Sequence, residues 1–91
     1  MPRPRMRRNI GFTPGVTYFK PQGIPLRELE EVTISHSELE ALRLINIDEF
    51  DQKKASEKMN ISQPTFFREL KAARKKLTKA IIEGKAIKIE K

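Results

Sequence analysis

The chain has 91 residues, a formal net charge of +7 and a sequence pI near 10.0. Its length predicts one small domain. It contains no cysteine and one histidine, which excludes a disulfide framework and zinc sites built from cysteine or several histidines. No apolar run reaches membrane-spanning length, so we expect a cytoplasmic protein.

The charge is unevenly distributed along the chain. Residues 1–20 carry five basic and no acidic side chains, residues 21–50 two basic and seven acidic, and residues 51–91 twelve basic and five acidic. The positive charge therefore comes from the two ends of the chain. This pattern indicates either a partner that is a polyanion, most commonly nucleic acid, or a solvated surface rich in lysine.

Residues 1–34 predict a basic arm followed by an irregular segment with short strands. The start, MPRPRMRRN, holds two prolines and four arginines, and proline disfavours helix. This arm either contacts DNA phosphates or a minor groove, or is only a soluble terminus. Further on, VTYFK (16–20) predicts a short strand, residues 26–31 a short helix, and VTI (32–34) extended backbone.

Residues 35–91 predict a helical domain with a C-terminal tail. Ser35 and Glu38 have the spacing of a capping box, so we expect a helix over 36–46. Helical spacing predicts an inner face that includes Leu44. The remaining members of this predicted face are Leu39, Leu42 and Ile45, and the predicted solvated face holds Glu38, Glu40 and Arg43.

A second helix is predicted over residues 52–59, capped by Asp51. In the loop before it, we expect Ile47 and Phe50 to fill gaps in the core. After it, Asn60 can adopt the left-handed conformation that ends a helix. Ile61 is expected to fill the gap behind this turn.

A long third helix is predicted over residues 63–83, with Ser62 as its N-cap and Gly84 ending it. Its predicted inner stripe consists of Phe66, Leu70, Ala73, Leu77 and Ile81, and Ala80 extends it. The tail, KAIKIEK, alternates in polarity and predicts a short strand, which residues 16–20 or 32–34 could pair with, within or between chains. The fold class is therefore mainly α, with a three-helix core and short β pairing between the N-terminal and C-terminal segments.

The second and third predicted helices meet the requirements of a helix-turn-helix. Small residues, Ala55 and Ser56, lie in the first helix, Asn60 forms the turn, and Ile61 and Phe66 point inward. The third helix would then enter the major groove of duplex DNA. Its predicted base-proximal residues are Gln63, Thr65, Phe67 and Arg68. The predicted phosphate contacts are Lys53, Lys54, Lys71, Arg74, Lys75 and the N-terminal end of the helix at Ser62.

Each of these residues also has a structural interpretation. Phe67 could instead contact the N-terminal segment or a second chain. The basic residues could form a solvated face, although Glu69 is the only acid between residues 58 and 82, which favours phosphate contact.

The chain resembles a family of small uncharacterised prokaryotic proteins predicted to bind DNA, whose helix-turn-helix is similar to region 4 of sigma factors. The resemblance rests on blocks in the same order: MPRPR, VTYFKPQGIPLRELEEV, ELEALRL, QKKASEKMNISQPTFFREL, ARKKL and EGKAIKI. It implies DNA binding, with no reaction and no cofactor. The chain departs from the family at three positions. Relatives usually have glycine at the position of Asn60, often have arginine at that of Gln63, and commonly have an apolar residue at that of Glu69.

We therefore expect a small transcription regulator that binds duplex DNA as a homodimer, with the N-terminal segment and KAIKI as candidate dimer contacts. One alternative is a sigma-like module that docks on the transcription machinery. Another is an RNA-binding module that stacks bases on Tyr18, Phe19 and Phe67. An enzyme is not expected, because there is no cysteine, no glycine-rich phosphate loop and no carboxylate pair in an apolar setting.

Overall fold

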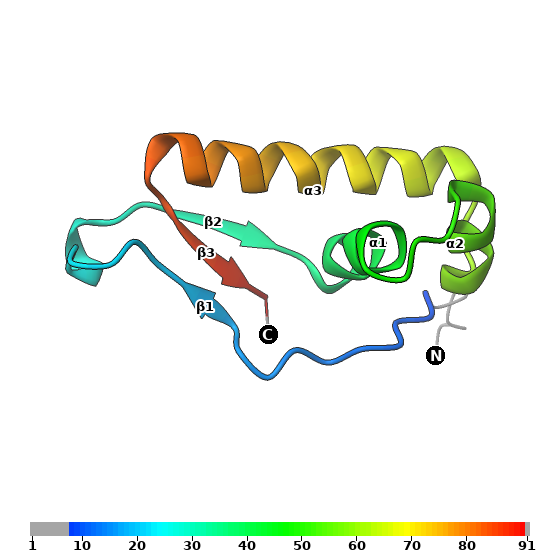
Figure 1. Ribbon diagram of the computed structural model, residues 1–91, viewed down its shortest axis with the longest axis horizontal. Helices are drawn as coiled ribbons and strands as arrows, with labels where there is room; N and C mark the ends of the chain where they lie inside the picture. The colour runs from blue at the N-terminus through cyan, green and yellow to red at the C-terminus, as the bar shows by residue number, and fades with distance from the viewer. Residues whose placement is uncertain (1–7, 91) are drawn as a thin grey trace, which may run out of the picture.

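The computed structural model describes residues 8–90. The helices are α1 (His36–Asn46), α2 (Gln52–Met59) and α3 (Gln63–Glu83), and a short 3-10 helix, η1, covers Leu26–Glu28. The strands are β1 (Tyr18–Phe19), β2 (Glu31–Ile34) and β3 (Ala86–Ile89). Figure 1 shows α3 along one side of the molecule, with α1 and α2 below its N-terminal half and the strands below its C-terminal half. The predicted fold class, mainly α with short β pairing, is confirmed.

The bounds of all three helices follow from local capping. Ser35 and Glu38 form the predicted capping box, and the side chains of Asp51 and Ser62 accept hydrogen bonds from the backbones of α2 and α3. At its other end α3 stops at Gly84, whose φ of 69° is left-handed. The predicted helix over 26–31 is the shorter η1.

The core lies where the three helices meet. Its buried members are Ala41, Leu44, Ala55, Met59, Phe66 and Leu70. On α3 the predicted stripe continues through Ala73 to Ala80, which is buried as expected, but the prediction for Ile81 is wrong, because its side chain is 73% exposed. A helix has 3.6 residues per turn, so the buried side chains must be spaced alternately four and three residues apart to remain on one face.

The inner face of α1 is also partly wrong. Leu39, Leu42 and Ile45 are only half-buried, although the last two pack against the core. Glu38 and Glu40, expected in solvent, are 8% and 3% exposed. The reason is that α1 has neighbours on both sides: α3 lies above it and the N-terminal segment runs below it (Figure 1).

The connection between α2 and α3 is a three-residue turn. Asn60 adopts φ 61° and ψ 45°, and Ile61 packs against the core as predicted. In the loop before α2, Phe50 also packs against the core, whereas Ile47 is 73% exposed, contrary to expectation. Ile47 is the C-cap of α1 and still has right-handed helical backbone. The gap in the core is therefore filled by Phe50, whose backbone N–H donates to the Leu44 carbonyl at 3.0 Å.

The sheet joins the two ends of the chain, in the order β1-β3-β2. The tail strand β3 pairs antiparallel with β1 and parallel with β2, so both candidate segments are its partners within one chain. Ile34, Ala86 and Ile89 are buried beneath α3, while Ile87 is half-buried. Because β3 is central, both of its backbone edges are used.

The two adjacent phenylalanines of α3 offer a direct test of this packing. Phe66 is fully buried and Phe67 is 48% exposed. We expect Phe66→Ala to lower the free energy of unfolding by about 3–5 kcal/mol, because it leaves a cavity in the core. Phe67→Ala should change it by less than about 0.5 kcal/mol. Urea denaturation followed by circular dichroism measures both, and equal losses would contradict the assignment.

Candidate nucleic-acid interface

The outer face of α3 carries most of the predicted contact residues. Gln63, Phe67 and Arg68 are exposed in its first two turns, and Lys71, Arg74 and Lys75 are exposed further along. Phe67 is nearly half exposed, and no apolar cluster of the core includes it. The outer face is thus a basic surface with one large apolar side chain near its N-terminal end.

The N-terminal turn of α3 is tightly hydrogen-bonded. The Ser62 hydroxyl accepts from the Thr65 N–H at 3.2 Å and donates to the Thr65 hydroxyl at 2.9 Å. Arg68 donates to the same Thr65 oxygen at 3.3 Å. Thr65 is half-buried, so its hydroxyl holds the Arg68 guanidinium rather than projecting from the face.

This turn offers an anion fewer donors than we expected. Pro64 has no N–H, the Thr65 N–H is used by the Ser62 cap, and the Phe66 N–H donates to the Ser62 carbonyl at 2.9 Å. Among the residues that the structure describes, the Gln63 N–H is the one backbone donor of this turn that these hydrogen bonds do not use. The helix end can therefore add one backbone contact to a phosphate, not several.

Lys53 and Lys54 lie at the start of α2, beside the N-terminal end of α3 (Figure 1). Both are exposed. The Asp51 carboxylate caps the helix by accepting from the Lys54 backbone N–H at 2.8 Å. The two ammonium groups thus extend the basic surface from α3 onto α2.

The basic residues of the protein fall into two classes. One class forms ion pairs with nearby acids; its members are Arg8, Arg43, Lys76, Lys79 and Lys85. The other class, within residues 8–90, forms no ion pair; it includes all six predicted contact residues, Lys53, Lys54, Arg68, Lys71, Arg74 and Lys75. The predicted contacts therefore keep their charge available for a partner.

Lys76 and Glu69 lie on the flank of α3 that faces the rest of the protein. The Lys76 ammonium lies 2.9 Å from Glu38 Oε1 and 3.0 Å from the Thr33 carbonyl oxygen. Glu69, at a position where an apolar residue is common in the family, pairs with Arg8 at 2.6 Å, while its other oxygen, Oε1, is buried and has no hydrogen-bond partner among residues 8–90. These contacts tie α3 to α1, β2 and the N-terminal segment.

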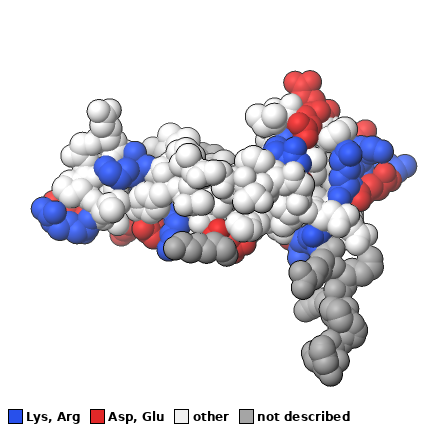
Figure 2. All heavy atoms as spheres, turned by 90° about the horizontal axis from the view of Figure 1, so that it is seen from below, with Lys and Arg blue, Asp and Glu red and all other residues white. Residues whose placement is uncertain are grey.

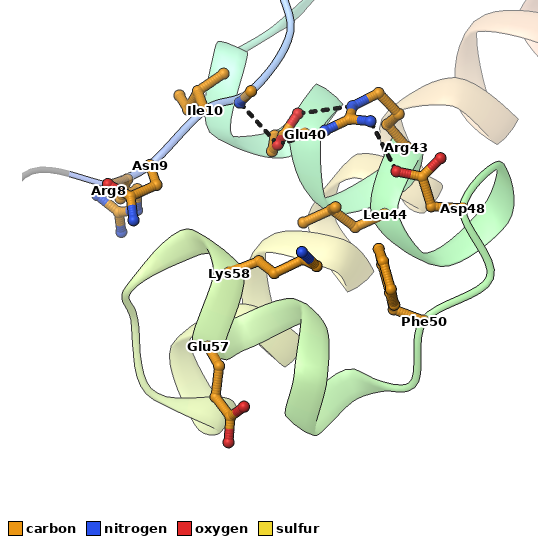
Figure 3. A pocket seen from close by; sticks show the side chains of 11 residues that line it. Arg8, Asn9, Ile10, Glu40, Arg43, Leu44, Asp48, Phe50, Glu57 and Lys58 are labelled. Carbon is orange, nitrogen blue, oxygen red and sulfur yellow. Dashed lines mark hydrogen bonds and ion pairs between the residues drawn. The ribbon is translucent and has the colours of Figure 1, made fainter.

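The N-terminal segment is held by a buried carboxylate (Figure 3). Glu40 Oε2 accepts from the Gly11 N–H at 2.9 Å, and both Glu40 oxygens accept from Arg43, at 2.8 and 3.0 Å. Arg43 also donates to Asp48 at 2.8 Å. Burial raises the pKa of Glu40, but the bonds from Arg43 and Gly11 outweigh burial and hold it below the usual 4.5. A surface hollow of about 760 Å³ adjoins these groups.

This network was missed because its parts are far apart in sequence. Gly11 and Glu40 are 29 positions apart, and Arg8 and Glu69 are 61 apart. The one local signal was the three-residue spacing of Glu40 and Arg43, which allows a helical ion pair. Glu40, Arg43, Asp48 and the Gly11 N–H satisfy one another, so this network anchors the N-terminal segment.

The face opposite α3 is different in character. Figure 2 shows this face from below, with a broad uncharged middle and most charged groups toward its two ends. The segment from Asn9 to Phe19 crosses it and contains no charged residue. Tyr18 lies here, and its hydroxyl donates to Glu31 at 2.8 Å, which raises its pKa. The protein therefore has a basic side on α3 and an uncharged side on the N-terminal segment.

Two other features are absent from the part of the chain that the structure describes. No group of three or more histidine, aspartate or glutamate side chains could hold a metal ion there. No helix among residues 8–90 is long and apolar enough to cross a membrane.

These features define a small, mainly α domain with a three-stranded sheet and a basic helical face. The chain belongs to the family described as "Protein of unknown function DUF134", which matches residues 1–91. No solved structure matches it.

Relatives come from bacteria and archaea. A "UPF0251 protein" of Moorella thermoacetica is 50% identical over 90 residues, covering 99% of this chain and 60% of the relative. One of Caldanaerobacter subterraneus subsp. tengcongensis is 48% identical over 90 residues, covering 99% and 76%. One of Methanosarcina acetivorans is 46% identical over 88 residues, covering 97% and 79%. The chain thus spans only about 60% of the length of the Moorella protein.

The Glu40 network generates a pH-dependent prediction. Because the folded protein lowers the pKa of Glu40, its contribution to stability is full above the unfolded pKa and is lost as pH falls through the folded value. We expect Glu40→Gln to lower the free energy of unfolding by about 1–3 kcal/mol at pH 7. The gap between variant and wild type should shrink below about pH 4.

Denaturant unfolding at several pH values measures this difference. The exposed Glu57→Gln serves as the control and should leave stability nearly unchanged throughout. A Glu40→Gln deficit that stays constant down to pH 2 would contradict the role assigned to the carboxylate.

Proposed function

We propose that the protein is a small transcription regulator that binds duplex DNA through α2 and α3, with α3 in the major groove. The observation that carries the proposal is the separation of paired from unpaired basic residues. Six acids form ion pairs, and their basic partners are Arg8, Arg43, Lys76, Lys79 and Lys85, which lie away from the outer face or at the far end of α3. The bases on the outer face remain without acidic partners among residues 8–90.

The geometry of α2 and α3 supports the same proposal. A helix of eight residues, a left-handed turn at Asn60 and an inward Ile61 precede α3, as in a helix-turn-helix. The close approach of the helices depends on Ala55 and Ser56, which are 0% and 2% exposed. This geometry leaves Gln63, Phe67 and Arg68 exposed on the outer side of the first turns of α3, which supports a role as a recognition helix.

Each contact residue has a proposed role. Gln63 can form two hydrogen bonds with adenine, and Arg68, held by Thr65, can form two with guanine. Phe67 covers a thymine methyl group. The phosphates are bound at the Ser62 end of the helix, through the Gln63 N–H, and by the side chains of Lys53, Lys54, Lys71, Arg74 and Lys75. The proposal involves no reaction and no cofactor, and it places the protein in the cytoplasm with the DNA.

A second candidate, docking on the transcription machinery, is favoured by the uncharged face. That face exposes Ile10, Phe12 and Val16 at 39%, 43% and 60%. It lies opposite α3 (Figures 1 and 2), so a protein bound there would leave the basic surface accessible to DNA. An affinity capture with Phe12→Lys as the control separates this contact from binding through α3.

Selection of duplexes from a random library tests the DNA proposal. Wild type should enrich a short motif, and Arg68→Ala should relax preference at one guanine, a loss of about 1–3 kcal/mol of discrimination. Lys75→Ala should weaken binding to all sequences alike and reduce the salt slope by about 1.

Lys88→Ala is the matched control, because Lys88 is an exposed lysine on β3, outside the proposed surface. It should leave both affinity and preference unchanged. RNA of the same sequence serves as competitor. Absence of any enriched motif with wild type, or stronger competition by RNA than by duplex DNA, would overturn the proposal.

A further inference from the structure

The C-terminal half of α3 exposes an apolar side chain among basic ones. Ile82 is 78% exposed, the largest exposed fraction of any large apolar side chain within residues 8–90. It follows Lys79 by three residues, Thr78 by four and Lys75 by seven, so these exposed side chains share one face of the helix. A single exposed isoleucine is common in proteins, so its surroundings decide whether it marks a contact surface.

Ile82 lines a surface hollow of about 480 Å³, here called the Ile82 hollow. The other residues that line it are Arg74, Lys75, Thr78, Lys79 and Glu83. Long basic side chains supply apolar methylene groups to such walls and keep their charged ends in water. The Ile82 hollow can therefore take up a large apolar side chain of a partner, while its basic rim attracts negative charge.

The positive charge of this rim is mostly uncompensated. Arg74 and Lys75 form no ion pair in the part of the chain that the structure describes. Lys79 lies 3.4 Å from Glu83, but Glu83 also pairs with Lys85 at 3.3 Å. A single acid thus stands against three basic side chains around the hollow. Such a rim selects a partner that carries several acidic groups.

We propose that the Ile82 hollow binds an acidic segment of a second, different protein, with a large apolar side chain of that segment packed on Ile82. The carboxylates of the segment would pair with Arg74, Lys75 and Lys79. This surface lies on α3 and is separate from the uncharged face on the N-terminal segment (Figure 1). The same surface of a second copy is not a suitable partner, because the two basic rims would repel each other.

Duplex DNA in the proposed position does not cover Ile82. The base-proximal residues end at Arg68, and Ile82 lies fourteen residues further on, about 21 Å at 1.5 Å per residue. The major groove is only about 12 Å wide. An isoleucine side chain also has no group that binds a phosphate. The apolar part of the hollow therefore needs a different partner from the one proposed for the first turns of α3.

The acidic partner and DNA would share two basic residues. Arg74 and Lys75 line the Ile82 hollow and are also proposed phosphate contacts. An acidic segment that pairs with them removes two positive charges from the DNA-binding surface, so the partner and the duplex compete. This regulatory consequence rests on the proposed function, whereas binding of the acidic segment does not.

Fluorescence anisotropy of a labelled peptide, without DNA, tests the surface itself. The probe is an amphipathic peptide of about 18 residues with glutamates on either side of one apolar face, and a scrambled peptide of the same composition is its control. The whole chain should bind the probe at least about tenfold more tightly than the scrambled peptide. Ile82→Ser and Lys79→Ala should each raise the dissociation constant at least about fivefold.

Two variants elsewhere on the surface serve as matched controls. Ile47→Ser changes an isoleucine that is 73% exposed at the end of α1, and Lys88→Ala changes an exposed lysine on β3. Neither should alter binding of the probe. Because Ile82 and Lys79 are also exposed, none of the four variants should change helix content by circular dichroism.

Three results would overturn the proposal. The first is equal binding of the probe and the scrambled peptide, or unchanged affinity of both Ile82→Ser and Lys79→Ala. The second is self-association of wild type in sedimentation that Ile82→Ser abolishes, because a second copy would then occupy the hollow. The third is a loss of duplex affinity in Ile82→Ser, which would assign Ile82 to the DNA contact.

Competition against a selected duplex tests the regulatory consequence. Saturating probe should raise the dissociation constant of wild type for the duplex at least about tenfold and leave that of Ile82→Ser nearly unchanged. An unchanged duplex affinity of wild type would contradict competition. Probe binding by a protein that binds no duplex would contradict the proposed function but not the Ile82 hollow, and duplex binding without probe binding would do the reverse.

Discussion

The left-handed backbone of Asn60 fixes how α2 and α3 meet. A positive φ is costly for most residues, and asparagine tolerates it through its short polar side chain. Because the chain reverses there within three residues, Met59 and Phe66 on either side of the turn both reach the core. The position of Phe66 then decides which way every later side chain of α3 faces. Phe67, one residue further on, is turned outward by the same constraint.

The charged residues fall into two groups, those that form ion pairs within the protein and those that do not. In the acidic middle of the chain, Glu38 and Glu40 are withdrawn from the surface, since both are buried and engage Lys76 and Arg43. Such partly buried pairs position elements more than they stabilise them. Arg8 and Glu69 do the same between the N-terminal segment and α3. The predicted contact residues on α2 and α3, which form no ion pair within residues 8–90, lie on one side of the protein, and the uncharged segment lies on the other.

Local signals predicted much of the fold. Caps at Ser35, Asp51, Ser62 and Gly84 act within one turn, so the helix bounds could be derived from neighbouring residues. Burial of Glu40 could not, because it depends on Gly11, 29 positions away. The exposure of Ile47 was missed for a local reason, because its backbone continues the helix and Phe50 packs against the core instead.

The features of the candidate site were likewise predictable where they depend on local sequence and not where they depend on tertiary packing. Helical periodicity separated Phe66 from Phe67, because the two differ only in which way they face on one regular element. Periodicity could not tell that Lys76 is held by Glu38 while Lys75 is unpaired, since that depends on where α1 packs. Nor could it assign the hydroxyl of Thr65 to Arg68, which requires the actual side-chain geometry.

The central claim is that duplex DNA binds the outer face of α3. Backbone amide chemical shifts, followed by NMR during titration with a duplex, test it most directly. The account predicts the largest changes in residues 62–75 and at Lys53 and Lys54, with residues 9–19 nearly unaffected. The absence of any change, or changes centred on residues 9–19, would contradict it.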